Sequence, residues 1–119
     1  MKIRIKGNSL RYRLTRSDVN RLAESGCLED KVDFPGSTFS YVLQLTDDEQ
    51  LASGFSNNTI TLYMPKQMLK ELANTDKVGF ENTVDNIFLL VEKDFTCLDN
   101  VDEDQSDNYP NPLAERIKQ

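Results

Sequence analysis

The residues best suited to chemistry are basic side chains near the start of the chain. Residues 1–6 read Met-Lys-Ile-Arg-Ile-Lys and residues 10–14 read Leu-Arg-Tyr-Arg-Leu, so apolar and basic residues alternate with the period of a β-strand. Gly7 and Asn8 between them are typical of a type II′ hairpin turn, because glycine adopts a positive φ without strain. The sequence therefore predicts a β-hairpin with one apolar face and one basic face.

A two-residue turn fixes the cross-strand partners on the basic face. Arg4 then lies opposite Arg11, and Lys2 lies opposite Arg13. Like charges directly opposite each other destabilise a sheet, so this face requires water, salt or an anion beside it. Three alternatives stay open: a solvated face, pairing with the chain's own acids, chiefly within residues 92–107, and binding of an anion such as phosphate, which arginine contacts in a bidentate manner. The candidate residues for binding an anion or a partner are Lys2, Arg4, Arg11 and Arg13.

A pair of carboxylates follows the most apolar segment of the chain. Residues 87–91 are apolar on both faces, which favours a central strand, and alternation then places Glu92 and Asp94 on one face. Two carboxylates near basic residues could hold a divalent ion or act as acid and base. The acidic segment 99–107 imitates the start of an EF-hand loop, but the glycine of the turn and the final glutamate are missing. We therefore predict no metal site, no cofactor and no catalytic residue.

Composition excludes several function classes. The 119 residues carry a formal net charge of −6 and include no histidine, which rules out histidine-ligated zinc, Ser-His-Asp triads and Cys-His dyads. An acidic surface repels nucleic acid and acidic membranes, and no apolar run is long enough to span a bilayer, so we expect neither partner. Two cysteines, Cys27 and Cys97, are too few for a disulfide framework. We interpret both as structural thiols of a reduced, cytoplasmic protein.

Two helices and a series of strands complete the pattern. Thr15 is a typical helix N-cap with Asp18 at the third helical position, and Gly26 is a typical helix stop. A second short helix is predicted from Pro65, a typical first helical residue, to Asn74, with Met68, Leu69, Leu72 and Ala73 as its apolar residues. Eight segments have the composition or alternation of strands: residues 1–6, 10–14, 27–34, 39–45, 51–55, 59–64, 78–81 and 87–91.

This order of elements predicts an α+β fold without an internal repeat. We expect a mostly antiparallel, strongly curled sheet or partial barrel of about eight short strands, with two short helices. Residues 1–98 would form the single domain, and residues 99–119 would form an extended, acidic, proline-containing C-terminal tail.

Four segments of the chain resemble a known family. They are residues 1–15 (MKIRIKGNSLRYRLT), 75–79 (TDKVG), 89–98 (LLVEKDFTCL) and 103–112 (EDQSDNYPNP). Together they resemble a family of small bacterial proteins that is uncharacterised. The resemblance implies a bacterial, cytosolic, stand-alone domain, and it carries over no activity, ligand or catalytic residue.

These observations favour a non-enzymatic binding or protein-interaction domain. The basic hairpin face would hold an acidic protein or the chain's own C-terminal tail, with a phosphate-bearing small molecule as a further choice, and charge complementarity would set specificity. The alternative is a metal-assisted enzyme that handles phosphate or nucleotides, with Glu92 and Asp94 near a divalent ion. An unpaired edge strand would be compatible with a monomer or a homodimer.

Overall fold

Eight strands and two helices are present in the computed structural model, which describes residues 1–95 and 106–110. The α+β class and both helices are therefore confirmed. The elements are β1 (Lys2–Lys6), β2 (Ser9–Leu14), α1 (Arg16–Ser25), β3 (Cys27–Phe34), β4 (Ser37–Thr46), β5 (Ala52–Ser56), β6 (Thr59–Pro65), α2 (Lys66–Asn74), β7 (Gly79–Val84) and β8 (Ile87–Lys93).

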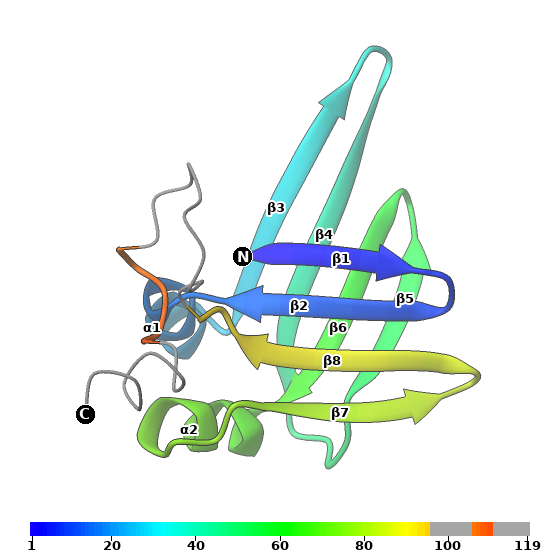
Figure 1. Cartoon of the computed structure of the whole chain (residues 1–119). Helices are drawn as coiled ribbons and strands as arrows, with labels where there is room; N and C mark the ends of the chain where they lie inside the picture. Colours follow the sequence, from blue (N-terminus) through cyan, green and yellow to red (C-terminus); the bar gives the residue numbers. More distant parts are fainter. Residues whose placement is uncertain (96–105, 111–119) are drawn as a thin grey trace.

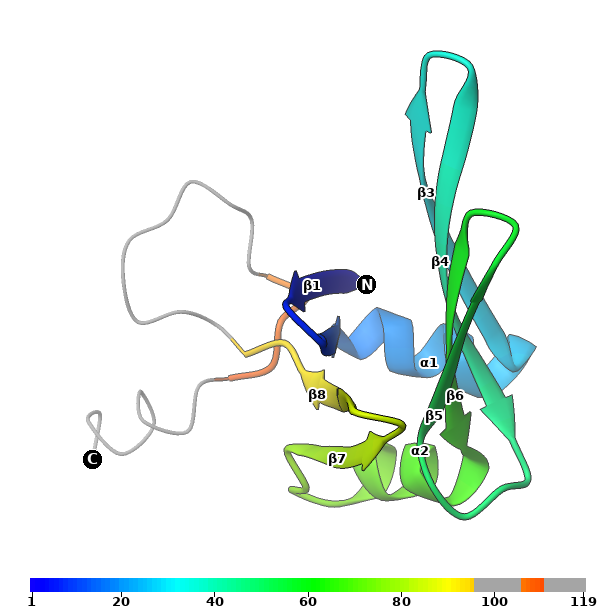
Figure 2. The ribbon, with the colours of Figure 1, turned by 90° about the vertical axis from the view of Figure 1, so that its right-hand side faces the viewer.

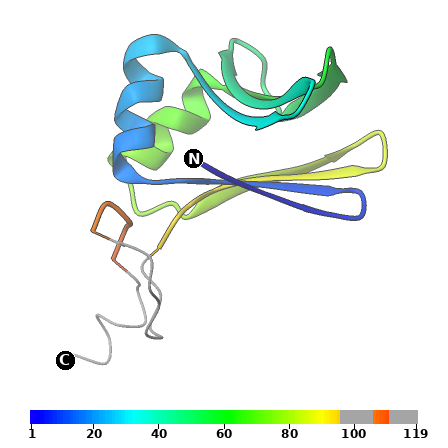
Figure 3. The ribbon, with the colours of Figure 1, turned by 90° about the horizontal axis from the view of Figure 1, so that it is seen from above.

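The strands form two four-stranded sheets that face each other (Figure 1, Figure 3). Sheet A has the order β1-β2-β8-β7, and sheet B has the order β3-β4-β6-β5. The predicted central position of residues 87–91 is confirmed, because β8 lies inside sheet A. The predicted curled sheet or partial barrel is wrong. Each sheet is open, and each contains one parallel pair, β2–β8 in sheet A and β4–β6 in sheet B.

The helices explain why one continuous sheet does not form. Helix α1 carries the chain from β2 in sheet A to β3 in sheet B, and α2 carries it back from β6 to β7. Both helices lie at the same end of the two sheets (Figure 3). Each crossover therefore moves the next hairpin into the opposite sheet. In sheet B the two paired hairpins follow each other in the chain, whereas in sheet A the first hairpin pairs with the last.

The chain contains a structural repeat that its sequence does not indicate. Two strands, a helix and two strands occur twice, and equivalent turns lie fifty positions apart, from residue 7 to residue 57 and from residue 35 to residue 85. The antiparallel registers follow the same spacing, since the Lys2–Arg13 pair corresponds to Ala52–Tyr63. Each sheet thus combines one hairpin from each half of the chain.

The core is built from equivalent positions of the two halves. These positions share apolar character and burial, but among them only Leu22 and Leu72 are the same residue type. The equivalent buried pairs are Tyr12 and Leu62, Leu14 and Met64, Val19 and Leu69, and Leu22 and Leu72. The ring of Tyr12 meets that of Tyr41 edge-on across the sheets, with 6.4 Å between centroids.

No helix among the described residues is long and apolar enough to cross a membrane.

The start of α1 is fixed by the buried carboxylate of Asp18. The predicted capping is confirmed: the Asp18 N–H donates to Thr15 Oγ1 at 3.2 Å, and the Thr15 N–H donates to Asp18 Oδ2 at 2.9 Å. The same carboxylate contacts the Met1 amino group at 2.9 Å and Arg21 Nη2 at 2.6 Å. Asp18 therefore joins the start of the chain, beside β1, to the start of α1.

We predict that Asp18→Asn lowers the free energy of unfolding by about 3 kcal/mol at neutral pH, because it removes a buried carboxylate that pairs with the Met1 ammonium group and with Arg21. Burial alone raises the pKa of Asp18, but hydrogen bonds from the Met1 amino group and Thr15 outweigh burial and lower it. A lowered pKa contributes stability above the unfolded value of about 3.9, and this stability is lost as the pH falls through the folded value.

Urea unfolding at a series of pH values checks this prediction. The loss of stability between about pH 5 and pH 2 should be smaller in Asp18→Asn than in the unchanged protein. An equal pH dependence in the two proteins would contradict the role assigned to Asp18.

Candidate functional site

The predicted basic face exists and lies on the outside of sheet A. Arg4 pairs with Arg11 and Lys2 with Arg13, in the predicted register. The alternate residues of β2, such as Tyr12, are fully buried, so Arg11 and Arg13 point away from the core. The turn that fixes this register has the predicted positive φ of 54° at its glycine.

Part of this face is neutralised by the chain's own acids. The parallel pairing of β2 with β8 places Glu92 beside Arg13, and Arg13 Nε donates to Glu92 Oε1 at 3.0 Å. Arg11 Nε lies 3.6 Å from the same oxygen, and Lys2 Nζ lies 3.1 Å from Asp94 Oδ2. Glu92 and Asp94 are the carboxylates of the alternative enzymatic hypothesis. Both therefore form ion pairs with basic side chains of the same chain.

Asp94 follows the end of β8 and is buried. Its Oδ2 atom accepts no hydrogen bond within the described part of the chain despite the nearby Lys2 ammonium. Its N–H donates to the Leu14 carbonyl, and its own carbonyl accepts from the Tyr109 N–H. Residues 1–95 and 106–110 contain no group of three or more side chains that could hold a metal ion.

The turn end of the basic face differs from the neutralised end. A hollow of about 140 Å³ lies there, with Arg4, Lys6 and Arg11 in its lining together with Ser9 and Phe88. Arg4 and Lys6 form no ion pair with any residue that the structure describes, and Arg11 has only its 3.6 Å contact with Glu92. Within the described part of the chain, the basic side chains of this face that lack a close acidic partner therefore lie beside the turn.

Four lining residues of this hollow were not among the predicted site residues: Lys6, Ser9, Leu10 and Phe88. Lys6 follows the same alternation as Lys2 and Arg4, so the period of the strand could have identified it. Phe88 reaches the hollow only because β8 pairs in parallel with β2, opposite Ser9. Such a long-range pairing leaves no local signal in the sequence.

The described part of the C-terminal tail binds elsewhere. Ser17 donates to Asp107 Oδ1 through its N–H at 3.3 Å and its hydroxyl at 2.9 Å, at the first turn of α1. A hydrogen bond from Thr15, together with those from Ser17, lowers the pKa of Asp107. The ring of Tyr109 packs against that of Phe95, with 6.1 Å between centroids. Residues 96–105 and 111–119, which include Cys97 and most of the predicted acidic tail, lie outside the described residues.

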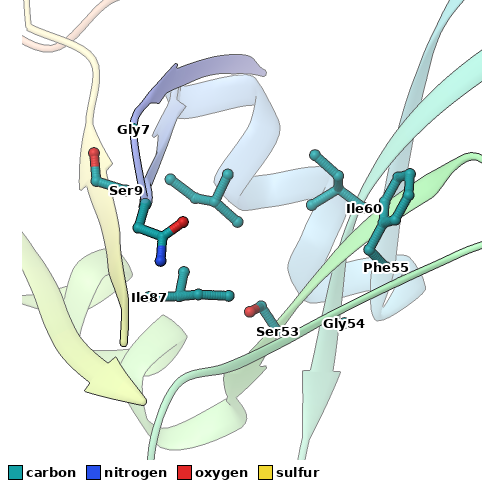
Figure 4. Close-up of a pocket in the computed structure, with 9 residues that line it drawn as sticks. Gly7, Ser9, Ser53, Gly54, Phe55, Ile60 and Ile87 are labelled. Carbon is teal, nitrogen blue, oxygen red and sulfur yellow. The ribbon is translucent and has the colours of Figure 1, made fainter. Parts of the chain in front are cut away.

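A second hollow lies on the opposite side of the first hairpin, between the two sheets (Figure 4). It has a volume of about 220 Å³ and lies between the turn of β1 and β2 and the strands β5 and β6. Its apolar lining consists mainly of Leu10, Phe55, Ile60 and Ile87, and it has no charged residue. This hollow is therefore separate from the basic face and unsuited to an anion.

We predict that Glu92→Gln destabilises the protein by about 1 kcal/mol or less at low salt, because its partners are partly exposed. The effect should disappear near 1 M NaCl, where the screening length falls to about 3 Å. Urea unfolding at both salt concentrations measures it, with Glu24→Gln on α1 as the control. Equal effects of the two substitutions at both salt concentrations would contradict the ion pairing described above.

Comparisons with known proteins place the chain in a family. No curated protein and no solved structure matches it. A model described as a family of unknown function, DUF7009, matches residues 1–113. This match agrees with the resemblance to an uncharacterised family and extends over both hairpins of each sheet. The chain therefore belongs to the DUF7009 family.

Proposed function

We propose that this protein is a non-enzymatic binding domain that holds an acidic segment of a partner protein on the outer face of sheet A. The observation that carries the proposal is the unequal neutralisation of that face. Lys2 and Arg13 contact Asp94 and Glu92, whereas Arg4 and Lys6 line a hollow without an acidic partner among the described residues. We propose the bacterial cytoplasm as the place of this interaction, as the resemblance to an uncharacterised bacterial family implies.

The charges at the turn end favour an anionic group. Arg4 lies directly opposite Arg11, and this like-charged pair destabilises the sheet unless a negative charge offsets it. A carboxylate between the two guanidinium groups would remove that repulsion and accept bidentate hydrogen bonds. Binding of an acidic side chain would thus be coupled to relief of a repulsion already present in the free protein.

The size of the hollow favours a side chain over a nucleotide. Its volume is about 140 Å³, whereas pockets for drug-sized ligands occupy about 300–1,000 Å³. The net charge of −6 also opposes long-range attraction of a polyanion. A partner that presents carboxylates at short range therefore fits this face better than a nucleotide or a nucleic acid does.

We predict that Arg4→Glu weakens binding of a fluorescein-labelled hexaglutamate peptide at least about tenfold at low salt, since one charge-assisted hydrogen bond contributes about 1.5–3 kcal/mol. Lys31→Glu is the matched control, because it changes the net charge equally on exposed strand β3. Fluorescence anisotropy measures both affinities.

Three results would contradict the proposed function. Equal weakening by Arg4→Glu and Lys31→Glu would show that only net charge matters. Binding that is independent of Arg4 and Arg11 would place the acidic peptide elsewhere. Competition by pyrophosphate at concentrations well below those of the peptide would favour the phosphate-bearing ligand instead.

A further inference from the structure

Strand β1 forms an edge of sheet A beside the basic face. It pairs with β2, and no other described strand pairs with it. In a hairpin with a two-residue turn, the pair next to the turn exchanges both hydrogen bonds, and hydrogen-bonded and non-hydrogen-bonded pairs then alternate. Lys6 and Ser9 are the pair next to the turn, so Ile3 and Ile5 belong to non-hydrogen-bonded pairs. Their N–H and C=O groups therefore point toward the outer edge of β1.

Past this edge, the inner face of sheet B carries one acidic residue, Asp30, whose carboxylate lies 3.9 Å from the Met1 amino group, and then the apolar residues Val32 and Phe34. The hairpin of β3 and β4 projects well beyond β1 (Figure 1, Figure 2). Val32 pairs with Phe39, which packs against the core, so Val32 and Phe34 belong to the inner face of sheet B. They are nevertheless 43% and 56% exposed, because sheet A does not extend over this part of the hairpin.

The edge of β1 lies next to the exposed inner face of the β3–β4 hairpin, so one added strand could contact both. A further strand beside β1 would extend sheet A over the projecting hairpin, as β1 and β2 already extend over sheet B. Its inward side chains would cover Val32 and Phe34, and its outward side chains would lie beside Arg4 and Lys6. Ile5, on the inner face of β1 and 55% exposed, would gain cover from the same strand.

We propose that β1 accepts an extended segment of a partner protein as a fifth strand of sheet A, with acidic residues alternating with apolar ones. This inference rests on the proposed function and specifies how the acidic partner binds. Addition of a strand to a sheet edge supplies backbone hydrogen bonds for affinity and alternate side chains for specificity. The acidic residues would neutralise Arg4 and Lys6, and the apolar residues would bury Phe34.

Charge complementarity selects this occupant over a second copy of the chain. If β1 of another copy paired with β1, it would bring Lys2, Arg4 and Lys6 next to the same residues of its partner. Like charges on adjacent strands oppose such pairing. An acidic strand of about five residues, the length of β1, replaces that repulsion with attraction.

The first test compares two peptides and two phenylalanine variants. A labelled peptide of about seven alternating valine and glutamate residues should bind about tenfold more tightly than a peptide with the same composition in two blocks. Phe34→Ser should weaken binding of the alternating peptide about tenfold and leave hexaglutamate binding unchanged. Phe55→Ser is the matched control, because Phe55 is an exposed phenylalanine on the inner face of β5.

The second test measures the amide hydrogen-exchange rates of the residues at the outer edge of β1. The amides of Ile3 and Ile5 should exchange more slowly when the alternating peptide is bound. Unchanged exchange in the saturated complex would overturn strand addition. Protection of both amides in the free protein would also overturn it. Protection that rises with protein concentration would mean that a second copy covers the edge, and protection independent of concentration would mean that the chain itself covers it.

The two proposals fail in distinguishable ways. If Arg4→Glu weakens hexaglutamate binding but Phe34→Ser leaves the alternating peptide unaffected, the acidic partner stands and the added strand is overturned. If Arg4→Glu has no effect on either peptide, the proposed function falls, and the inference falls with it.

Discussion

Both sheets depend on parallel pairing between strands from opposite halves of the chain. Without the pairings of β2 with β8 and β4 with β6, the protein would consist of separate two-stranded hairpins, which are marginally stable in water. The β2–β8 pairing also assembles the basic face, because it brings Glu92 to Arg13 and Phe88 to the turn. The same contact that completes the core therefore determines which basic side chains of this face Glu92 neutralises.

A second constraint is the carboxylate of Asp18, which acts at the junction of several elements. Because it contacts both the Met1 amino group and the first turn of α1, the end of β1 cannot shift relative to the helix without separating buried charges. Asp107 of the tail adds hydrogen bonds at the same helix start, through Ser17. The edge strand proposed to receive a partner is thus anchored firmly at one end, whereas its other end, at Gly7, carries the unneutralised cations.

Local sequence signals predicted the local structure well. Strict alternation and a two-residue turn were sufficient for the register of the first hairpin, and Thr15, Asp18 and Gly26 were sufficient for the bounds of α1. The two-sheet arrangement and the repeat could not be predicted, because equivalent core positions share burial but seldom residue type, as Tyr12 and Leu62 show. For the site, opposing arginines were predictable. The division of the basic face was not, since it depends on which strand lies beside β2, and strand order is a property of the whole chain.

The repeat has a consequence for refolding at high protein concentration. Each half supplies one hairpin to each sheet, and the halves are joined by the short segment between β4 and β5, residues 47–51. In a concentrated refolding solution, the first half of one molecule would meet the second half of another and find the same parallel pairings there. Reciprocal exchange would then yield a domain-swapped dimer with two complete cores, and only the connecting segment would differ in conformation. Refolding at low protein concentration would favour the monomer, because pairing of the two halves within one chain does not depend on concentration.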